Sequence, residues 1–290
     1  MNPLTEGSNT HLLLLADKYV QPRIIEFFRN RSFDVLSIEK AISNEDMINA
    51  VDNIKPSFVL SVNLYRYPPE ELFMEDKCRW INLHFGKLPG YAGAYPVQRA
   101  VIHGETEVGI TLNSINSYRG SIGIIGESAT PVFFNDTGYS VSERCIEIGE
   151  SLIDENLRDL LTPNLKPSKN SPTWAKIWNR AFDDLKAINW NRTAFEIHNQ
   201  IRSFSRPYEG VSTVINGKRT IIWDSELSDP FCYDVTPGTI LNRYKRTGLE
   251  VATGSGTLRI LEFEVEKKWD LCKGDCFANL SSEQQIYEGV

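Results

Sequence analysis

Asn82 and His84 are the residues of this 290-residue chain whose types and spacing best suit catalysis. They end the apolar run WINLHF (80–85), and alternate side chains of a strand point to the same face, so the amide and the imidazole should lie side by side. An asparagine amide donates hydrogen bonds to a developing oxyanion, and an imidazole can do the same or accept a proton from a nucleophile. The pair predicts acyl transfer without a covalent enzyme intermediate. The alternative is that both residues cap a strand.

Short apolar runs that alternate with helical patterns predict where this pair lies. Apolar runs occupy 11–17, 33–39, 57–63, 80–85 and 109–115, and helical patterns occupy 22–30, 44–54, 96–104 and 142–161. This alternation is typical of a parallel sheet that helices cover on both faces. Ligands of such sheets bind beyond the carboxyl ends of the strands, where Asn82 and His84 stand.

The pattern changes after residue 161. A proline-containing connector (162–172) precedes a helical pattern at 190–204, and short β-rich pieces separated by NG, PG, TG and GSG turns follow from Arg206. These pieces predict a small β-barrel-like domain. We therefore expect an α/β protein with a first domain at 1–189, a linker helix at 190–205 and a second domain at 206–290.

The totals exclude several classes of protein. A formal net charge of -7 argues against a dedicated nucleic-acid binder, which normally has a basic face. Five scattered cysteines favour reduced thiols in the cytoplasm, and CKGDC (272–276) has no second Cys/His pair at zinc-site spacing, so no metal is expected. The run LLLLA is too short to span a bilayer, and the polar N-terminus has no charged region of a signal peptide. A cytoplasmic protein without membrane contact is expected.

The block from Asn82 onward reads NLH, then KLPGYAGAYP and HGETEVGITL. This block resembles the pattern N-L-H-x-S-L-L-P-x-Y-R-G-x-x-P followed by N-G-E-T-x-T-G-V-T of the folate-dependent formyltransferases. Those enzymes move a formyl group from 10-formyltetrahydrofolate to an amine. VLSVNLYRYPPEEL, INWNRTAFEIHNQIRSFSRPYEGVSTVINGKRTIIW and PGTILNRYKRTGLEVATGSGTLRILEFE extend the resemblance over nearly the whole chain. It implies a Rossmann-like N-terminal formyltransferase domain and a smaller, OB-like C-terminal β-barrel domain.

The resemblance also implies roles for individual residues. Asn82 and His84 would be catalytic and stabilise the tetrahedral oxyanion. Substrate contacts are expected at Tyr65, Arg66, Tyr91 and Arg119, and contacts to 10-formyltetrahydrofolate are expected at Leu88, Pro89, Ile115 and Asn116.

This sequence departs from the family pattern at the acid. An ungapped match puts Gly120 where the family has its catalytic Asp, and no acid occurs from Thr111 to Gly126. General acid–base groups contribute roughly 10²–10⁴-fold in rate, so this loss should slow ordinary formyl transfer severely. Gly86 stands in place of the family Ser, and Ala92 in place of the Arg of Y-R-G. The nearby acids Glu105, Glu107, Glu127 and Asp136 are expected to be structural rather than substitutes.

Three functions stay open at this point. The first is formyl transfer to a small amine, such as a nucleotide-linked amino sugar or an amino-acid derivative. The acidic total and the missing Asp count against tRNA as the substrate. The second is folate-independent chemistry such as hydrolysis, cyclisation or other acyl or carbamoyl transfer, and the third is a non-catalytic ligand-binding module. His198 is expected to pack or cap, and Arg202 and Arg206 either to contact a phosphate or to lie on the surface. The oligomeric state is not indicated.

Overall fold

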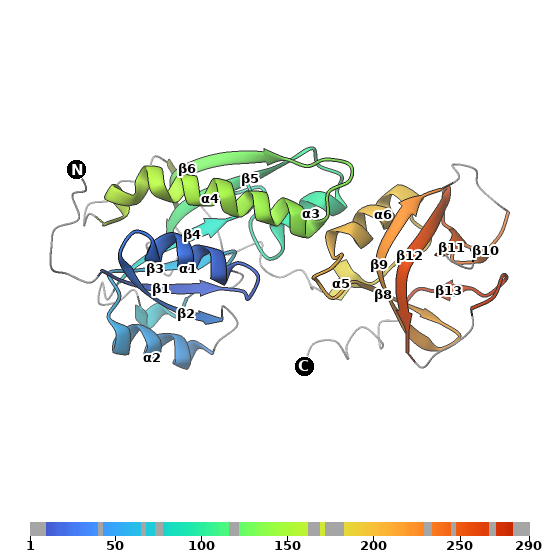
Figure 1. The fold of residues 1–290 in the computed structure, drawn as a ribbon, viewed down its shortest axis with the longest axis horizontal. Helices are drawn as coiled ribbons and strands as arrows, with labels where there is room; N and C mark the ends of the chain where they lie inside the picture. The colour runs from blue at the N-terminus through green and yellow to red at the C-terminus, as the bar shows by residue number, and fades with distance from the viewer. Residues whose placement is uncertain are drawn as a thin grey trace. The chain divides into compact units, whose positions relative to one another are not determined.

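The computed structural model describes residues 10–39, 43–64, 68–72, 78–115, 122–161, 169–171, 183–228, 234–244, 248–266 and 271–280. The chain divides into two compact units (Figure 1). Unit 1 comprises 1–96, 108–130 and 143–179, and unit 2 comprises 97–107, 131–142 and 180–290. Each unit is therefore assembled from separate stretches of sequence. The domain boundaries at 189/190 and 205/206 stay predictions.

Unit 1 is built on a seven-stranded sheet with the order β2-β1-β3-β4-β5-β6-β7. The strands are β1 Thr10–Ala16, β2 Phe33–Glu39, β3 Phe58–Val62, β4 Arg79–His84, β5 Glu107–Ile115, β6 Ile122–Pro131 and β7 Lys169–Ser171. β1 to β4 pair in parallel, as the alternation of apolar runs and helices predicts. The Rossmann-like character of this domain is thereby confirmed.

The prediction of a parallel sheet is wrong beyond β4. β5 runs antiparallel to β4, and β7 runs antiparallel to β6. A strand that is buried along its length has the same continuous apolar pattern whichever way its neighbour runs, so the sequence carried no sign of this reversal. The strand β6 was not predicted either.

Helices lie on both faces of this sheet (Figure 1). α1 (Gln21–Arg29) covers the face that carries Phe58, since Phe28 packs edge-on against both Phe33 and Phe58. α4 (Gly138–Leu161) packs on the same face, because a Cβ at Gly149 would lie 2.5 Å from a methyl of Leu83.

The opposite face carries α2 (Asn44–Ile54) and the predicted catalytic pair. Met47 and Val51 of α2 share a hydrophobic cluster with Val59 and Trp80. Trp80 lies two residues before Asn82 on β4, and alternate residues of a strand share a face. Asn82 and His84 therefore lie on the α2 face.

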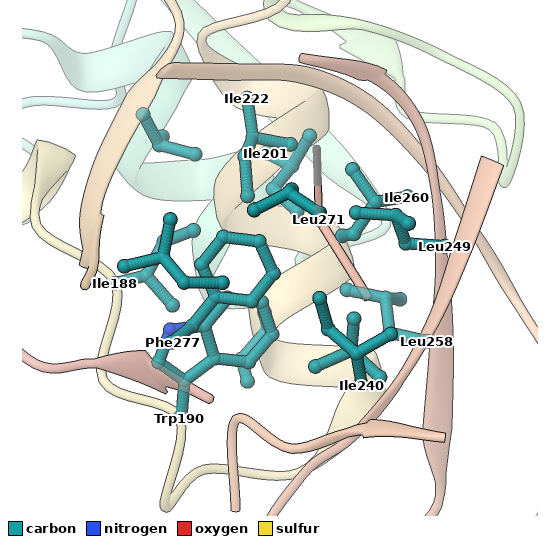
Figure 2. Close-up of a cluster of buried hydrophobic side chains, with 14 of the residues drawn as sticks. Ile188, Trp190, Ile201, Ile222, Ile240, Leu249, Leu258, Ile260, Leu271 and Phe277 are labelled. Atoms are coloured by element: carbon teal, nitrogen blue, oxygen red, sulfur yellow. The ribbon is translucent and has the colours of Figure 1, made fainter. Parts of the chain in front are cut away.

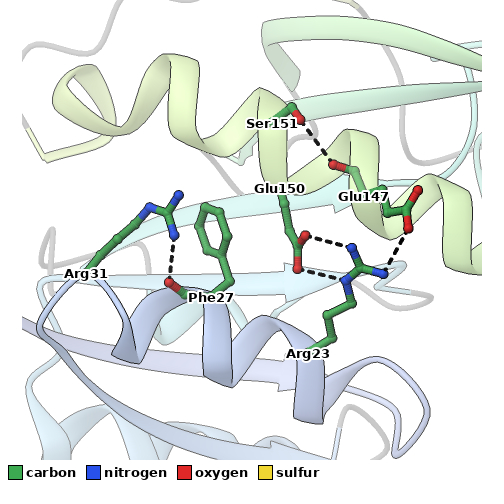
Figure 3. Close-up of polar contacts among 6 residues, drawn as sticks. All are labelled: Arg23, Phe27, Arg31, Glu147, Glu150 and Ser151. Carbon is green, nitrogen blue, oxygen red and sulfur yellow. Dashed lines mark hydrogen bonds and ion pairs between the residues drawn. The ribbon is translucent and has the colours of Figure 1, made fainter.

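Ion pairs join α1 to α4 within unit 1 (Figure 3). Arg23 donates two hydrogen bonds of 3.0 Å to the carboxylate of Glu150 and a longer one of 3.4 Å to Glu147. The hydrogen bond to Glu150 raises the pKa of Arg23. Arg31 donates to the Phe27 carbonyl oxygen at 2.9 Å and lies over the Phe27 ring. The bidentate pair of Arg23 and Glu150 fixes the relative orientation of the two side chains as well as adding interaction energy.

Unit 2 is built on a curled antiparallel sheet with the order β10-β11-β12-β9-β8-β13. The strands are β8 Val211–Ile215, β9 Lys218–Leu227, β10 Ile240–Tyr244, β11 Gly248–Ala252, β12 Thr257–Val265 and β13 Phe277–Ala278. Phe277 N–H donates to the Gly238 carbonyl at 2.9 Å, and Ile240 N–H donates to the Asp275 carbonyl at 2.8 Å, so the two edges of the sheet approach each other. The predicted β-barrel-like domain is confirmed.

The core of unit 2 forms between this sheet and α6 (Ala194–Ser203) (Figure 2). Trp190 stacks on Phe277 with ring centroids 5.2 Å apart, and its indole N–H donates to Thr213 Oγ1 at 2.9 Å. A capping box between Thr193 and Glu196 starts the helix. The remaining short helices are α3 Pro96–Ile102, α5 Asp183–Lys186 and the 3-10 turn Glu70–Leu72.

Two leucines of β12 offer a matched test of this core. Leu258 is 0% exposed and Leu261 is 39% exposed. We expect Leu258→Ala to lower the free energy of unfolding by about 2–5 kcal/mol, because it removes buried contacts and leaves a cavity. Leu261→Ala should cost less than about 1 kcal/mol. Urea unfolding followed by tryptophan fluorescence measures both, and equal losses would contradict this description of the core.

Candidate functional site

A row of three buried polar side chains crosses the sheet of unit 1. The strand register places Ser61 of β3 beside Asn82 of β4, and Asn82 beside Asn113 of β5. All three are 0% exposed. Ser61 Oγ donates to Asn82 Oδ1 at 3.0 Å, and Asn82 Nδ2 donates to Asn113 Oδ1 at 3.2 Å. The row joins three strands through side chains on one face.

The neighbours of this row fix the orientation of the Asn82 amide. The indole N–H of Trp80 donates to Ser61 Oγ at 3.2 Å, and the Ser61 hydroxyl has two acceptors, Asn82 Oδ1 at 3.0 Å and the Ile81 carbonyl oxygen at 3.3 Å. The backbone N–H of Leu64 also points at Asn82 Oδ1, at 3.4 Å. A backbone N–H can only donate, so the Leu64 N–H places Oδ1 toward β3 and Nδ2 toward β5. One of the two Nδ2 protons is used by Asn113, and the other remains for a ligand.

His84 lies next to this row, with 1% of its surface exposed. Its Nε2 is 2.8 Å from the backbone carbonyl oxygen of Tyr91. A carbonyl oxygen only accepts hydrogen bonds, so Nε2 carries the proton, and in the neutral ring Nδ1 holds the lone pair. The geometry therefore makes Nδ1 the atom of His84 that can accept a proton.

The loop after β4 is held against His84 by Thr111. Thr111 pairs with His84 in the register of β4 and β5, and its hydroxyl donates to the Gly86 carbonyl at 2.8 Å. The Thr111 hydroxyl oxygen also accepts from the Leu88 N–H at 3.3 Å. The hydroxyl thus ties both ends of the turn that begins the loop.

Gly86 is needed for this loop conformation. A Cβ at Gly86 would lie 2.9 Å from His84 Nε2 and 2.9 Å from the Tyr91 carbonyl oxygen. Side chains do not tolerate contacts this short, so any other residue would push the loop off the imidazole. A glycine at this position therefore lets the loop close directly on His84.

The structure brings several of the predicted site residues together. Leu88 and Ile115 are buried in the same hydrophobic cluster as Trp80 and Ala92, whereas Pro89 is exposed. Tyr65, Arg66, Asn116, Arg119 and Gly120 lie outside the described residues. Their roles, and that of the half-buried Tyr91, stay predictions.

Carboxylates are absent from the polar row that the structure describes. Asp136, the one buried carboxylate in the described part of the chain, lies in unit 2. It accepts hydrogen bonds from the Phe133 N–H at 2.6 Å and from Ser140 Oγ at 2.8 Å, which is a structural role at the start of α4. Glu105, Glu107 and Glu127 are exposed.

Ser61, Thr111 and Asn113 were missed as functional candidates. Each is a polar residue inside an apolar strand pattern, SFVLSVN or GITLNSI. Buried polar side chains need hydrogen-bond partners, so these interruptions were the signal that could have identified the row. Their pairing with Asn82 and His84 required the register of the strands.

Unit 2 contains a separate pocket of about 460 Å³ that is lined by Phe134, Asn135, Asp136, Thr137, His198, Arg202, Ser205, Asp224, Ser225, Glu226 and Leu227. His198 Nδ1 lies 3.0 Å from Ser225 Oγ, and burial lowers the pKa of His198 to about 4. Arg202 is buried and donates to the Asp136 carbonyl at 2.6 Å and to Asn199 at 2.9 Å. Arg202 therefore supports the fold and is not a surface residue.

Within the ranges that the structure describes, no group of three or more His, Cys, Asp or Glu residues is arranged to hold a metal ion. None of the helices in the same ranges combines the length and the apolar character that crossing a membrane requires.

Comparisons with known proteins agree with this architecture. Residues 26–157 match the formyl transferase family model, and residues 183–279 match the formyl transferase C-terminal domain. The methionyl-tRNA formyltransferase of Caldicellulosiruptor saccharolyticus is 26% identical over 246 residues, which are 84% of this chain and 78% of that protein.

Two solved structures share the fold. HypX from Aquifex aeolicus, in complex with tetrahydrofolic acid, superposes with a TM-score of 0.70 at 18% identity over 97% of this chain. This chain spans about half of HypX, 47% of its length. The N-formyltransferase from Helicobacter canadensis, in complex with folinic acid and dTDP-3-aminofucose, has a TM-score of 0.58 at 21% identity, over 86% of this chain and 98% of that one.

A substitution at Gly86 tests whether the loop after β4 rests on His84. Gly86→Ala should lower the free energy of unfolding by about 1–3 kcal/mol, because the new methyl overpacks the space between His84 and Tyr91. Gly90→Ala is the matched control in the same loop, since its Cβ would meet the Lys87 carbonyl oxygen at an ordinary 3.6 Å. Thermal unfolding compares the two variants. Equal stability of both would show that the loop does not rest on His84.

The half-buried His198 makes the stability of the protein depend on pH. Burial lowers the pKa of His198 to about 4, against 6.5 for the free side chain. Between these two values the unfolded chain binds a proton at this residue and the folded chain does not. The stability that this residue contributes is complete above about pH 6.5 and is lost as the pH falls toward 4. His198→Asn keeps a polar atom near Ser225. In this variant the urea concentration at the unfolding midpoint should fall less between pH 7 and pH 4.5 than it does in the wild type. Identical slopes for both proteins would contradict the assignment.

Proposed function

We propose that this chain, which belongs to the formyl transferase family through both of its domains, moves a formyl group from 10-formyltetrahydrofolate to the amino group of a small molecule. The observation that carries the proposal is the oriented amide of Asn82 beside the imidazole of His84. An amide donor fixed in advance can stabilise negative charge as it develops on a carbonyl oxygen, at no cost in reorganisation during the reaction.

The residues of the site suit a formyl-folate donor. Leu88, Ala92 and Ile115 supply buried apolar surface beside Trp80. The Nδ2 group of Asn113 is buried there without a hydrogen-bond partner among the described residues, as expected where a polar ligand group completes the site. We propose that Leu88, Pro89, Ile115 and Asn116 contact the folate. When bound, 10-formyltetrahydrofolate supplies the formyl group.

Each catalytic residue then has one task. Asn82 donates its remaining Nδ2 proton to the formyl oxygen. His84 accepts the proton of the attacking amine at Nδ1, while Nε2 stays on the Tyr91 carbonyl. By the ungapped match, Gly120 takes the position of the family acid, and a glycine has no carboxylate to charge or orient an imidazole, so we expect turnover about 10²–10⁴-fold below that of a relative with the acid.

The acceptor that we propose is a nucleotide-linked amino sugar or an amino-acid derivative. The structural relative from Helicobacter canadensis is in complex with dTDP-3-aminofucose, which is such an amino sugar. Tyr65, Arg66, Tyr91 and Arg119 would hold this acceptor, with the two arginines facing its phosphates. The net charge of -7 disfavours a tRNA acceptor, although the sequence relatives include methionyl-tRNA formyltransferases.

Binding of a stable donor analogue is the first test. We expect 5-formyltetrahydrofolate to bind the purified chain with a dissociation constant in the micromolar range by isothermal titration calorimetry. Absence of binding at millimolar ligand would overturn the proposed function and favour folate-independent chemistry at His84.

Turnover is the second part of the same test. The chain is incubated with 10-formyltetrahydrofolate and either dTDP-amino sugars, amino-acid amides or methionyl-tRNA, and release of tetrahydrofolate is measured. Asn82→Ala and His84→Ala should each lower kcat by roughly 10²–10³-fold, the effect of losing a donor or a base. His11→Ala, a change at an exposed histidine of β1, is the control and should leave kcat unchanged. Turnover with methionyl-tRNA alone would overturn the small-molecule assignment.

A further inference from the structure

Asn113 is the polar residue of the site whose hydrogen bonds are incomplete. Its Oδ1 accepts from Asn82, whereas its Nδ2 has no partner among the residues that the structure describes. The side chain is 0% exposed, so bulk solvent does not reach it. Buried N–H groups are rarely left in this state, because they lose their hydrogen bonds to water on folding. An orphaned donor inside a site points to a ligand atom that accepts a hydrogen bond.

The row directs its spare donors toward β5. At the β3 end, the Ser61 hydroxyl is occupied by Trp80, Asn82 and the Ile81 carbonyl oxygen. At the β5 end, one proton of Asn82 Nδ2 and both protons of Asn113 Nδ2 remain. The two amides are joined by a hydrogen bond of 3.2 Å, so these protons belong to neighbouring groups on the same face of the sheet.

We propose that Asn113 is a second donor to the formyl oxygen, and that its own Oδ1 holds the amide of Asn82. This inference rests on the proposed formyl transfer. In that reaction the amine nitrogen forms a bond to the formyl carbon, the bond from that carbon to N10 of the donor breaks, and the amine proton passes through His84 to N10. Two amide donors on the oxygen make the carbon more electrophilic, so a neutral amine attacks it with less help from a carboxylate. This pairing suits a chain with Gly120 in place of the acid.

Three variants on β5 separate the two roles of Asn113. Asn113→Ala removes both the acceptor for Asn82 and the donors. Asn113→Asp keeps the acceptor and the shape but removes the donors while the carboxyl is ionised. Ser114→Ala is the matched control, because Ser114 is buried on the opposite face of the same strand and its hydroxyl donates to the Gly123 carbonyl. Thermal unfolding of each variant shows that it folds.

The rate and its pH dependence report the donor. We expect kcat to fall roughly 10²–10³-fold in Asn113→Ala and in Asn113→Asp at pH 8, with Ser114→Ala unchanged. As the pH is lowered, Asn113→Asp should recover relative to the wild type measured at the same pH, because a protonated carboxyl regains an O–H donor. Asn113→Ala should show no such recovery. A merely structural role would give no pH-dependent recovery.

Binding gives a readout that does not depend on turnover. The dissociation constant for 5-formyltetrahydrofolate should rise about 2–10-fold in Asn113→Ala, the effect of one neutral hydrogen bond, and should not change in Ser114→Ala. Full kcat in folded Asn113→Ala, or in Asn113→Asp at pH 8, would overturn the donor role while leaving the proposed function intact. A wild-type chain that neither binds the analogue nor turns over would overturn both.

Discussion

The antiparallel register of β5 against β4 is the constraint on which the site depends. It sets Asn113 opposite Asn82 and Thr111 opposite His84, so that each predicted catalytic residue acquires one polar partner from the same neighbouring strand. One partner turns the amide and the other fastens the loop over the imidazole. A shift of β5 by one residue would send Asn113 and Thr111 to the other face, away from Asn82 and His84, because strand side chains alternate. The geometry of the predicted site is thus set by backbone pairing as much as by residue type.

The helices, the first four strands and the two-domain character followed from the sequence. Apolar periodicity identifies an element wherever one face is buried, as at 44–54, where Met47 and Val51 meet the sheet. The direction of β5 could not be predicted, because β5 is buried nearly throughout. Its continuous apolar pattern does not indicate whether the neighbouring strand runs parallel or antiparallel. Asn82 and His84 could be predicted because their chemistry shows in their types. Asn113 could not, because its significance arises from a partner 31 residues away.

The closed loop explains why a site with reactive groups is almost entirely buried. His84 is 1% exposed, and its Nε2 donates to the backbone carbonyl oxygen of Tyr91. Because this acceptor belongs to the backbone, a side-chain substitution in the loop does not remove it directly. A backbone acceptor carries no charge, so it fixes the tautomer of the ring without stabilising the imidazolium as a carboxylate would. The site therefore has a well-defined proton position on the imidazole.

The discontinuity of unit 2 bears on how such a protein can be recombined. Arg202 of α6 binds the Asp136 carbonyl, and the Ser203 carbonyl oxygen lies where a Cβ of Gly138 would be, so segment 131–142 is an integral part of the C-terminal unit. A single crossover near residue 190 would combine this segment from one parent with its packing partners from another. An exchange of C-terminal units between relatives, in nature or in the laboratory, therefore has to include the internal segments 97–107 and 131–142 as well. That requirement makes the apparent tail of the chain a poor modular part.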